Sequence, residues 1–168
     1  MYLNLSRQAS LVVRNVRSSS DVGGYTYFQF SPDIDLLEVR ADNVVVGYEL
    51  KGYRRKTRSI DAPQFYEGID QALAYLLNPV SSPLASTFVG SIFDYVYVVH
   101  PGGSQVEKLG PVIRECTPLG LIVVDRGWST EIVEPRKNPF LNEQMKSFFL
   151  GCLDRFKTYM TYSVNPIQ

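Results

Sequence analysis

The chain has 168 residues and a mass of 19.0 kDa, with 45% hydrophobic residues, 20% charged residues and a net charge of zero. These values are typical of one globular domain, expected to span residues 1–168, and they argue against bulk disorder and a uniformly basic surface. No apolar run reaches the ~18 residues of a membrane span and the N-terminus lacks a secretion-signal pattern, so we expect no membrane partner and an intracellular, cytoplasmic location. One histidine and two distant cysteines argue against zinc, disulfide and iron–sulfur frameworks.

The N-terminal third predicts one helix followed by strands. Residues 5–17 place apolar side chains at helical spacing, and the serine run at 18–20 ends the pattern. Residues 25–30 (YTYFQF) alternate polar and aromatic side chains, which is typical of a strand. The apolar runs 34–39 (IDLLEV) and 43–50 (NVVVGYEL) flank an Asp-Asn turn and predict a β-hairpin.

The remainder predicts alternating helices and strands. Residues 61–77 predict a helix, because Asp61 and Gln64 fit a capping box and Pro63 lies in the first turn. Two continuous apolar runs, 92–99 and 119–124, predict buried strands on either side of a helix at 105–116. A second long amphipathic helix is expected at 139–160. This order indicates an α/β fold in which helices flank a mixed β-sheet.

The predicted hairpin brings two carboxylates together. Folding it about Asp42 pairs residues whose numbers sum to 84, so that Asp35 faces Glu49 and Asp33 faces Lys51 on one face of the sheet. Facing carboxylates repel unless a cation compensates them, and Mg²⁺ prefers such oxygen ligands. The alternative is an exposed hairpin whose outer face carries ordinary surface charges.

The same residues resemble a known signature. The motif of the PD-(D/E)xK nuclease superfamily is similar to Pro32-Asp33-Ile34-Asp35, followed after thirteen residues by Glu49-Leu50-Lys51. The sequence of this stretch is especially close to archaeal DNA nucleases and Holliday-junction-resolvase-like proteins. Gln71 and Tyr75 resemble the Gln-x-x-x-Tyr motif of the RecB-like branch. The resemblance covers roughly residues 5–125 and implies a restriction-endonuclease-like core. Many relatives carry a Glu on the first helix, whereas residues 1–37 here contain none and Gln8 stands near that position.

The resemblance implies a role for each matched residue. Asp35 and Glu49 would bind Mg²⁺ or Mn²⁺ together with the main-chain carbonyl of Leu50, and Asp33 competes with Asp35 for the first ligand position. Lys51 would orient the attacking water or offset charge in the transition state.

The predicted helix would direct a polar stripe at the active site. Gln71 and Tyr75 are four residues apart and share one face, and Gln64 and Gly68 fall on the same stripe. The resemblance implies that this stripe faces the active site and the DNA backbone. The alternative is a solvated helix face that happens to carry a tyrosine.

Residues 51–58 (KGYRRKTR), called the basic segment below, concentrate positive charge. They hold five basic residues in a neutral chain, so the remainder has a net charge of about −5. We expect Arg54, Arg55, Lys56 and Arg58 to bind DNA phosphates, with the flanking Tyr48 and Tyr53 stacking on bases or sugars. A solvated loop is the alternative.

The function expected from these features is that of a metal-dependent DNA endonuclease in repair, recombination or defence. Two alternatives stay open: a catalytically weak or inactive nuclease-fold protein that binds nucleic acid or a partner, and an RNA-directed nuclease. A homodimer is expected, since resolvase-like relatives pair two active sites. An apolar stripe on the C-terminal helix is a possible interface, although it could instead cover the sheet of its own subunit. The stripe consists of Phe140, Leu141, Met145, Phe148, Phe149, Cys152, Leu153 and Phe156.

Overall fold

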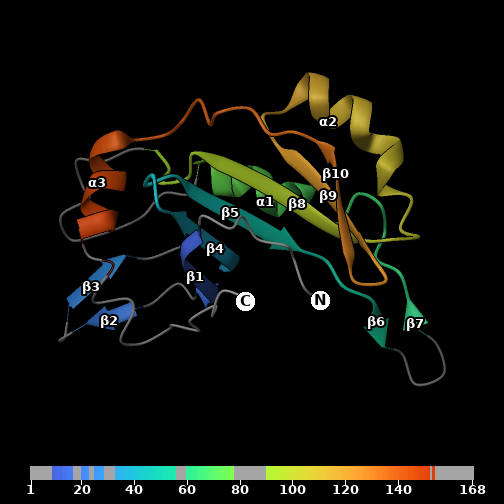
Figure 1. The fold of residues 1–168 in the computed structure, drawn as a ribbon, viewed down its shortest axis with the longest axis horizontal. Coiled ribbons are helices and arrows are strands. Elements are labelled where there is room, and N and C mark those ends of the chain that lie inside the picture. Colours follow the sequence, from blue (N-terminus) through green and yellow to red (C-terminus); the bar gives the residue numbers. More distant parts are fainter. Residues whose placement is uncertain are drawn as a thin grey trace.

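The core of the molecule is a six-stranded mixed sheet (Figure 1). The computed structural model describes residues 9–16, 20–22, 25–28, 33–55, 60–77, 90–151 and 153. In spatial order the strands are β1 (Ala9–Val16), β4 (Ile34–Arg40), β5 (Val45–Leu50), β8 (Tyr95–Pro101), β9 (Gly120–Asp125) and β10 (Trp128–Val133). The neighbours β5, β8 and β9 run parallel and the other pairs are antiparallel, which confirms the expected α/β fold with a mixed sheet.

Two short hairpins and three helices complete the described part of the chain. The hairpins join β2 (Ser20–Val22) to β3 (Tyr25–Phe28) and β6 (Arg54–Arg55) to β7 (Ile60–Asp61). The helices are α1 (Ile69–Leu77), α2 (Gly110–Cys116) and α3 (Glu143–Gly151), and the 3₁₀-helix η2 (Val106–Leu109) leads directly into α2. The predicted helix at 105–116 is therefore two consecutive helical pieces.

The β4–β5 hairpin has the predicted register. Leu36 pairs with Tyr48 and Val39 with Val45, so the numbers of paired residues sum to 84. Asn43 adopts a positive φ of 66°, a conformation that asparagine tolerates better than most residues. The Asp42 carboxylate accepts a hydrogen bond from the Val44 N–H at 3.2 Å and so helps to close the turn.

The helix predicted over residues 5–17 is wrong for residues 9–16, while residues 5–8 and 17 lie outside the described part of the chain. Residues 9–16 form the edge strand β1, which pairs antiparallel with β4 through contacts such as Val12 with Glu38 and Val16 with Ile34. The segment satisfied a helical spacing, but its β-branched valines also favour a strand, and pairing with β4 decides between the two.

The helix predicted over residues 61–77 begins eight residues later than expected, at Ile69. Asp61 pairs with Arg54 in the β6–β7 hairpin, so the apparent capping box with Gln64 belongs to a turn. Gly68 has a φ of +86°, which a right-handed helix does not allow, and α1 starts directly after it. Gln64 therefore lies outside the helix and off the stripe of Gln71 and Tyr75.

The second half of the chain follows the prediction with one added strand. The strand expected at 92–99 is β8, displaced by a few residues, and the strand expected at 119–124 is β9. The added strand β10 pairs antiparallel with β9 across a two-residue turn at Arg126 and Gly127, both with positive φ. Such a turn matches the twist of the flanking strands.

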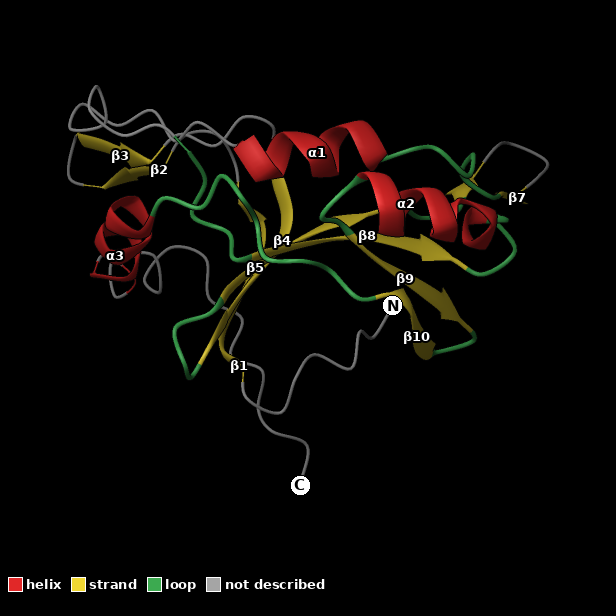
Figure 2. Ribbon diagram, turned by 90° about the horizontal axis from the view of Figure 1, so that it is seen from above, coloured by secondary structure: helices red, strands yellow, loops and turns green. Residues whose placement is uncertain are grey.

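The helices pack on one face of the sheet. Side chains of α1, α2 and α3 join one apolar cluster with Leu37, Val45 and Val98 of the strands, and Figure 2 shows α1 and α2 on the same side of the sheet. A second buried cluster, on the other face, consists of strand residues such as Leu36, Tyr48 and Val99. Because both faces are buried, the alternative of an exposed hairpin is wrong.

The α3 helix contributes to the core of its own chain. Met145 and Phe149 are each 2% exposed and belong to the main cluster, against which Phe148 and Leu153 also pack. This supports the alternative in which the stripe covers its own sheet, whereas Phe140, at 50% exposed, points outward. Cys152 and Phe156 lie outside the described residues. No helix in the described ranges is long and apolar enough to cross a membrane.

Candidate active site

Asp35 and Glu49 lie at the end of the β4–β5 ladder, beneath α1. The last paired residues toward this end are Leu36 and Tyr48, so the next step along both strands sets Asp35 beside Glu49. The Asp35 carboxylate accepts a hydrogen bond from the Leu50 N–H at 2.8 Å, which fixes it against the end of β5. Asp33 is exposed, and its main-chain carbonyl, 2.7 Å from the Tyr75 hydroxyl, also faces the site.

Tyr75 reaches from α1 to the Glu49 carboxylate. Its hydroxyl lies 2.5 Å from Glu49 Oε2 and accepts a hydrogen bond from the Asp35 N–H at 3.3 Å. Tyr75 is fully buried, so the alternative of a solvated helix face is wrong for this residue. The tyrosine thus ties the helix to both strands that carry the carboxylates.

Lys51 binds the other oxygen of Glu49. Its Nζ lies 2.5 Å from Glu49 Oε1 and donates a hydrogen bond to Gln71 Oε1 at the same distance. Gln71 and Tyr75, four residues apart on α1, therefore contact Lys51 and Glu49 respectively. The Lys51 N–H also donates to the Val99 carbonyl of β8 at 2.8 Å, which anchors the backbone where the side chain starts.

Burial governs the protonation chemistry of this group. Glu49 is 1% exposed, and burial raises its pKa, as does the nearby charge of Asp35, while the hydrogen bonds from Lys51 and Tyr75 oppose that shift. Burial and the Glu49 carboxylate both raise the pKa of Tyr75, so its hydroxyl remains a proton donor at neutral pH. Lys51 supplies the compensating positive charge.

Gly68 allows the turn before α1 to pass close to these side chains. A Cβ atom at this position would lie 2.5 Å from Lys51 Cε and 3.2 Å from Glu49 Cγ. The positive φ and the missing side chain are thus both needed here. Sequence reasoning placed Gly68 on the correct stripe but inside a helix, and so missed this role.

His100 is a second buried polar group near the site. It is fully buried at the end of β8, and its Nε2 lies 2.7 Å from the Glu67 carbonyl, which requires the nitrogen to donate. Its Nδ1 has no hydrogen-bond partner in the described part of the chain. Burial lowers the pKa of His100, and the neighbouring Lys51 lowers it further. Through this contact with Glu67 the residue supports the turn before α1, which is a structural role.

The predicted nucleic-acid contacts divide into three groups. Tyr53 is 53% exposed and remains available, whereas Tyr48 is 4% exposed and stacks on Tyr97, so its expected contact with bases is wrong. Arg54 and Arg55 form β6, and their side chains, like Lys56 and Arg58 as a whole, lie outside the described residues. Gln64 is exposed in the turn ahead of α1.

The donor set fits a hard cation that keeps part of its water shell. The described residues hold no group of three or more His, Cys, Asp or Glu side chains suited to a metal. Asp35, Glu49 and the Leu50 carbonyl, which lies on the same side of β5 as the N–H bound by Asp35, are the available oxygen donors. Mg²⁺ is commonly held by one or two carboxylates, waters and substrate phosphates, so this set suits Mg²⁺ or Mn²⁺ and not zinc.

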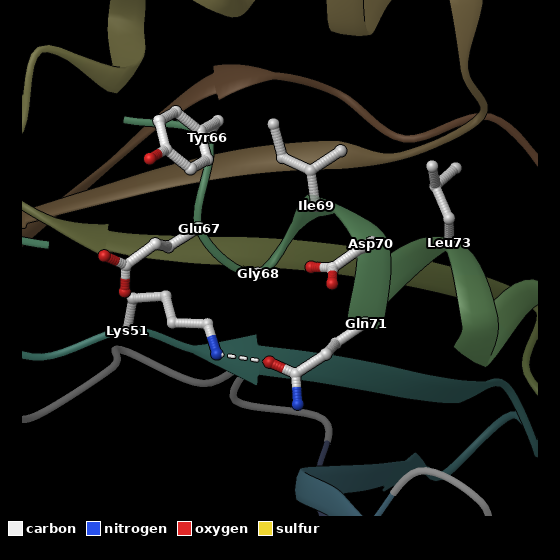
Figure 3. A pocket seen from close by; sticks show the side chains of 8 residues that line it. All are labelled: Lys51, Tyr66, Glu67, Gly68, Ile69, Asp70, Gln71 and Leu73. Atoms are coloured by element: carbon white, nitrogen blue, oxygen red, sulfur yellow. Dashed lines mark hydrogen bonds between the residues drawn. The ribbon is translucent and has the colours of Figure 1, made fainter. Parts of the chain in front are cut away.

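A pocket of about 520 Å³ opens beside Lys51 (Figure 3). Its walls come from the end of β5, the turn before α1 and the first turns of that helix. The lining residues are Lys51, Tyr66, Glu67, Gly68, Ile69, Asp70, Gln71 and Leu73. Sequence reasoning did not single out Tyr66, Glu67 or Asp70, because it read them as ordinary positions of a longer helix.

Comparisons of the chain with protein-family models, with curated proteins and with solved structures found no match.

Proposed function

We propose that the chain is a metal-dependent DNA nuclease with a restriction-endonuclease-like core. The observation that carries the proposal is the single hydrogen-bonded network formed by Asp35, Glu49, Lys51, Gln71 and Tyr75. These residues come from two strands and a helix and were selected from the sequence for one chemistry. A merely solvated set of charges would not be expected to converge in this way.

Each residue of the network has a part in phosphodiester hydrolysis. Asp35 and Glu49 would hold Mg²⁺ or Mn²⁺, which would supply acidification of a water and neutralisation of charge on the scissile phosphate. Lys51 places its ammonium group where negative charge develops. Tyr75 and Gln71 orient Glu49 and Lys51 through their hydrogen bonds, as neighbours of metal ligands commonly do.

The Lys51 ammonium group, 2.5 Å from Glu49 Oε1, would compete with a cation held by the Glu49 carboxylate. Its flexible stem and its link to Gln71 allow the ammonium group to turn toward the phosphate without leaving the site. Replacing Lys51 by Ala should therefore preserve or strengthen metal binding while it reduces cleavage.

A cleavage assay tests the proposal. Linear, single-stranded, flap and four-way-junction DNA would be incubated with Mg²⁺ or Mn²⁺ and either the wild-type protein or Glu49→Gln. We expect metal-dependent cleavage that falls by roughly a hundredfold or more in Glu49→Gln. Glu143→Gln makes the same chemical change on a side chain that is 64% exposed in α3 and should cleave normally. Equal rates for Glu49→Gln and wild type would overturn the proposal.

A second candidate is a nuclease-fold protein that binds nucleic acid or a partner without cutting. It is favoured by the absence of Glu from residues 1–37 and by the lack of a third acidic side chain at the described site. Binding of DNA without cleavage under any of the metal conditions above would select this candidate.

A further inference from the structure

The pocket beside Lys51 has one apolar wall. The ring of Tyr66 is 58% exposed and meets the ring of Phe65 edge to face at 5.3 Å between centroids, which holds it in place. Ile69 and Leu73 continue the wall along α1, and Leu73 is itself 37% exposed. Figure 3 shows these side chains in the upper part of the view and Lys51 and Gln71 in the lower part. Exposed aromatic and aliphatic groups beside a catalytic lysine are suited to a flat apolar ligand face.

The remaining lining residues are polar and carry both signs of charge. Lys51 and Gln71 stand at the edge nearest Glu49, while Glu67 and Asp70 supply carboxylates between that edge and the apolar wall. Carboxylates repel a phosphate but accept hydrogen bonds from the exocyclic amino groups of nucleobases. The pocket is therefore better suited to a base than to a phosphate, and Lys51 is the group that would meet the phosphate attached to it.

We infer that this pocket binds an unpaired nucleobase next to the phosphodiester held at Asp35 and Glu49. Its volume falls in the roughly 300–1,000 Å³ range of small-ligand sites, and the aromatic ring can stack on any base. A base within a duplex cannot reach such a pocket without leaving the stack. The inference rests on the proposed function and specifies its substrate class: DNA with an unpaired strand at the cleavage point, such as a single strand, a flap or a frayed end.

Fluorescence of 2-aminopurine tests the pocket without requiring catalysis. A single-stranded oligonucleotide carrying this base would be titrated with wild-type protein in the absence of divalent metal. We expect quenching on binding, an affinity about tenfold or more lower in Tyr66→Ala, and recovery in Tyr66→Phe, which keeps the ring. Phe140→Ala removes a similarly exposed ring from a residue outside the pocket, whose main-chain carbonyl accepts a hydrogen bond from the Ser91 N–H, and should bind as wild type does.

Cleavage measurements separate failure of the pocket from failure of the nuclease. Single-stranded DNA should be cut faster than a duplex of the same sequence, and Tyr66→Ala should remove that preference while Glu49→Gln removes cleavage itself. Quenching that depends on the Tyr66 ring would support base binding in the pocket even if no DNA is cut. That combination of results would contradict only the proposed nuclease activity. Equal cleavage rates on both substrates, together with unchanged DNA binding in Tyr66→Ala, would contradict base binding in the pocket but would not contradict the proposed nuclease activity.

Discussion

Asp35 faces Glu49 and also accepts a backbone hydrogen bond, and two substitutions separate these roles. Asp35→Asn keeps an oxygen for the Leu50 N–H but removes the charge, while Asp35→Ala removes both. We expect both variants to lose Mn²⁺ binding in calorimetric titrations. Without metal, Asp35→Asn should be at least as stable as wild type because repulsion with Glu49 is relieved, and Asp35→Ala should lose about 1 kcal/mol.

The matched control for this experiment is Asp42→Asn, at the exposed tip of the same hairpin. It makes the same change of charge and keeps an acceptor for the Val44 N–H, so Mn²⁺ binding should not change. Wild-type affinity in Asp35→Ala would remove Asp35 from the site and make Asp33 the ligand.

His100 predicts a loss of stability in mild acid. Its folded-state pKa is lowered, mainly by burial and also by Lys51, while Glu67 and Glu107 act in the opposite direction. The unfolded chain therefore binds a proton first, and the stability that the neutral ring provides is lost as pH falls from about 6.5 through the folded pKa. Protonation would also place a hydrogen on Nδ1, which has no acceptor among the described residues.

Urea unfolding of wild type and His100→Gln between pH 7.5 and 5 measures this effect. Gln can still donate to the Glu67 carbonyl but does not titrate, so its stability should fall less over this range. In both proteins the raised pKa of Glu49 favours the folded state as pH falls, which opposes the effect of His100. The difference in stability between the two proteins therefore isolates the contribution of His100. Parallel curves would assign the acid sensitivity to other groups.

At the scale of elements, the turn before α1 determines how closely the helix approaches the site. Gly68→Ala places a methyl group against Lys51 and forces a positive φ on a residue with a side chain. We expect a loss of about 1–2 kcal/mol in the free energy of unfolding and weaker cleavage, since Lys51 must move. Gly52→Ala is the control, because a Cβ there meets nothing within 4 Å and should change stability by no more than about 0.5 kcal/mol. Equal stability of the two variants would contradict the tight approach.

The basic segment is expected to supply the main electrostatic attraction to the phosphates of DNA. Neutralising Arg54, Arg55 and Arg58 together should weaken binding and flatten its salt dependence by about one unit of slope per lost phosphate contact. Binding would be measured by fluorescence anisotropy at salt concentrations from about 50 to about 300 mM, a range over which the Debye length shortens and charges are increasingly screened.

The control for this triple variant neutralises Arg114, Arg136 and Lys137, which carry the same charge on the exposed side of α2 and the loop after β10. Its slope should match that of wild type. A slope that stays unchanged in the basic-segment variant would mean that DNA binds elsewhere.

The hairpin at the centre of the site could be predicted from sequence because local and tertiary preferences agree there. The turn residues Asp42 and Asn43 set the register, and the alternation of side chains then brought Asp35 beside Glu49 without further information. Gln71 and Tyr75 followed from the spacing of a helix whose presence, though not its start, was clear.

Other elements could not be assigned because the deciding contacts are distant in sequence. The apolar side chains of residues 9–16 are compatible with both helical and strand spacing, and only pairing with β4 selects a strand. The start of α1 depends on pairing between Arg54 and Asp61 and on the conformation of Gly68. The strand β10 did carry a local signal, a two-residue Arg-Gly turn before the β-branched Thr130, Ile132 and Val133, which the prediction did not use.

At the scale of the whole molecule, the site lies where the carboxyl ends of the parallel strands meet the start of α1. The end of β5 provides Glu49 and Lys51, the end of β8 provides His100, and Tyr53 donates a hydrogen bond to the Gly102 carbonyl just beyond β8. Loops at this edge can vary while the sheet keeps the carboxylates in place. The pocket could not be seen in the sequence because most of its lining residues, 66–71 and 73, were assigned to a longer helix, and only the fold brings Lys51 to them.

A homodimer remains our proposal, because each chain supplies Asp35 and Glu49 only once and a second chain would bring a second site to the substrate. Met145 and Phe149 of the α3 stripe are buried in the core of their own chain, so these two residues are unsuited to a dimer contact. Light scattering at micromolar concentration should give about twice the 19.0 kDa chain mass. A mass of 19.0 kDa with and without DNA would contradict the dimer and indicate a monomer that cuts one strand at a time.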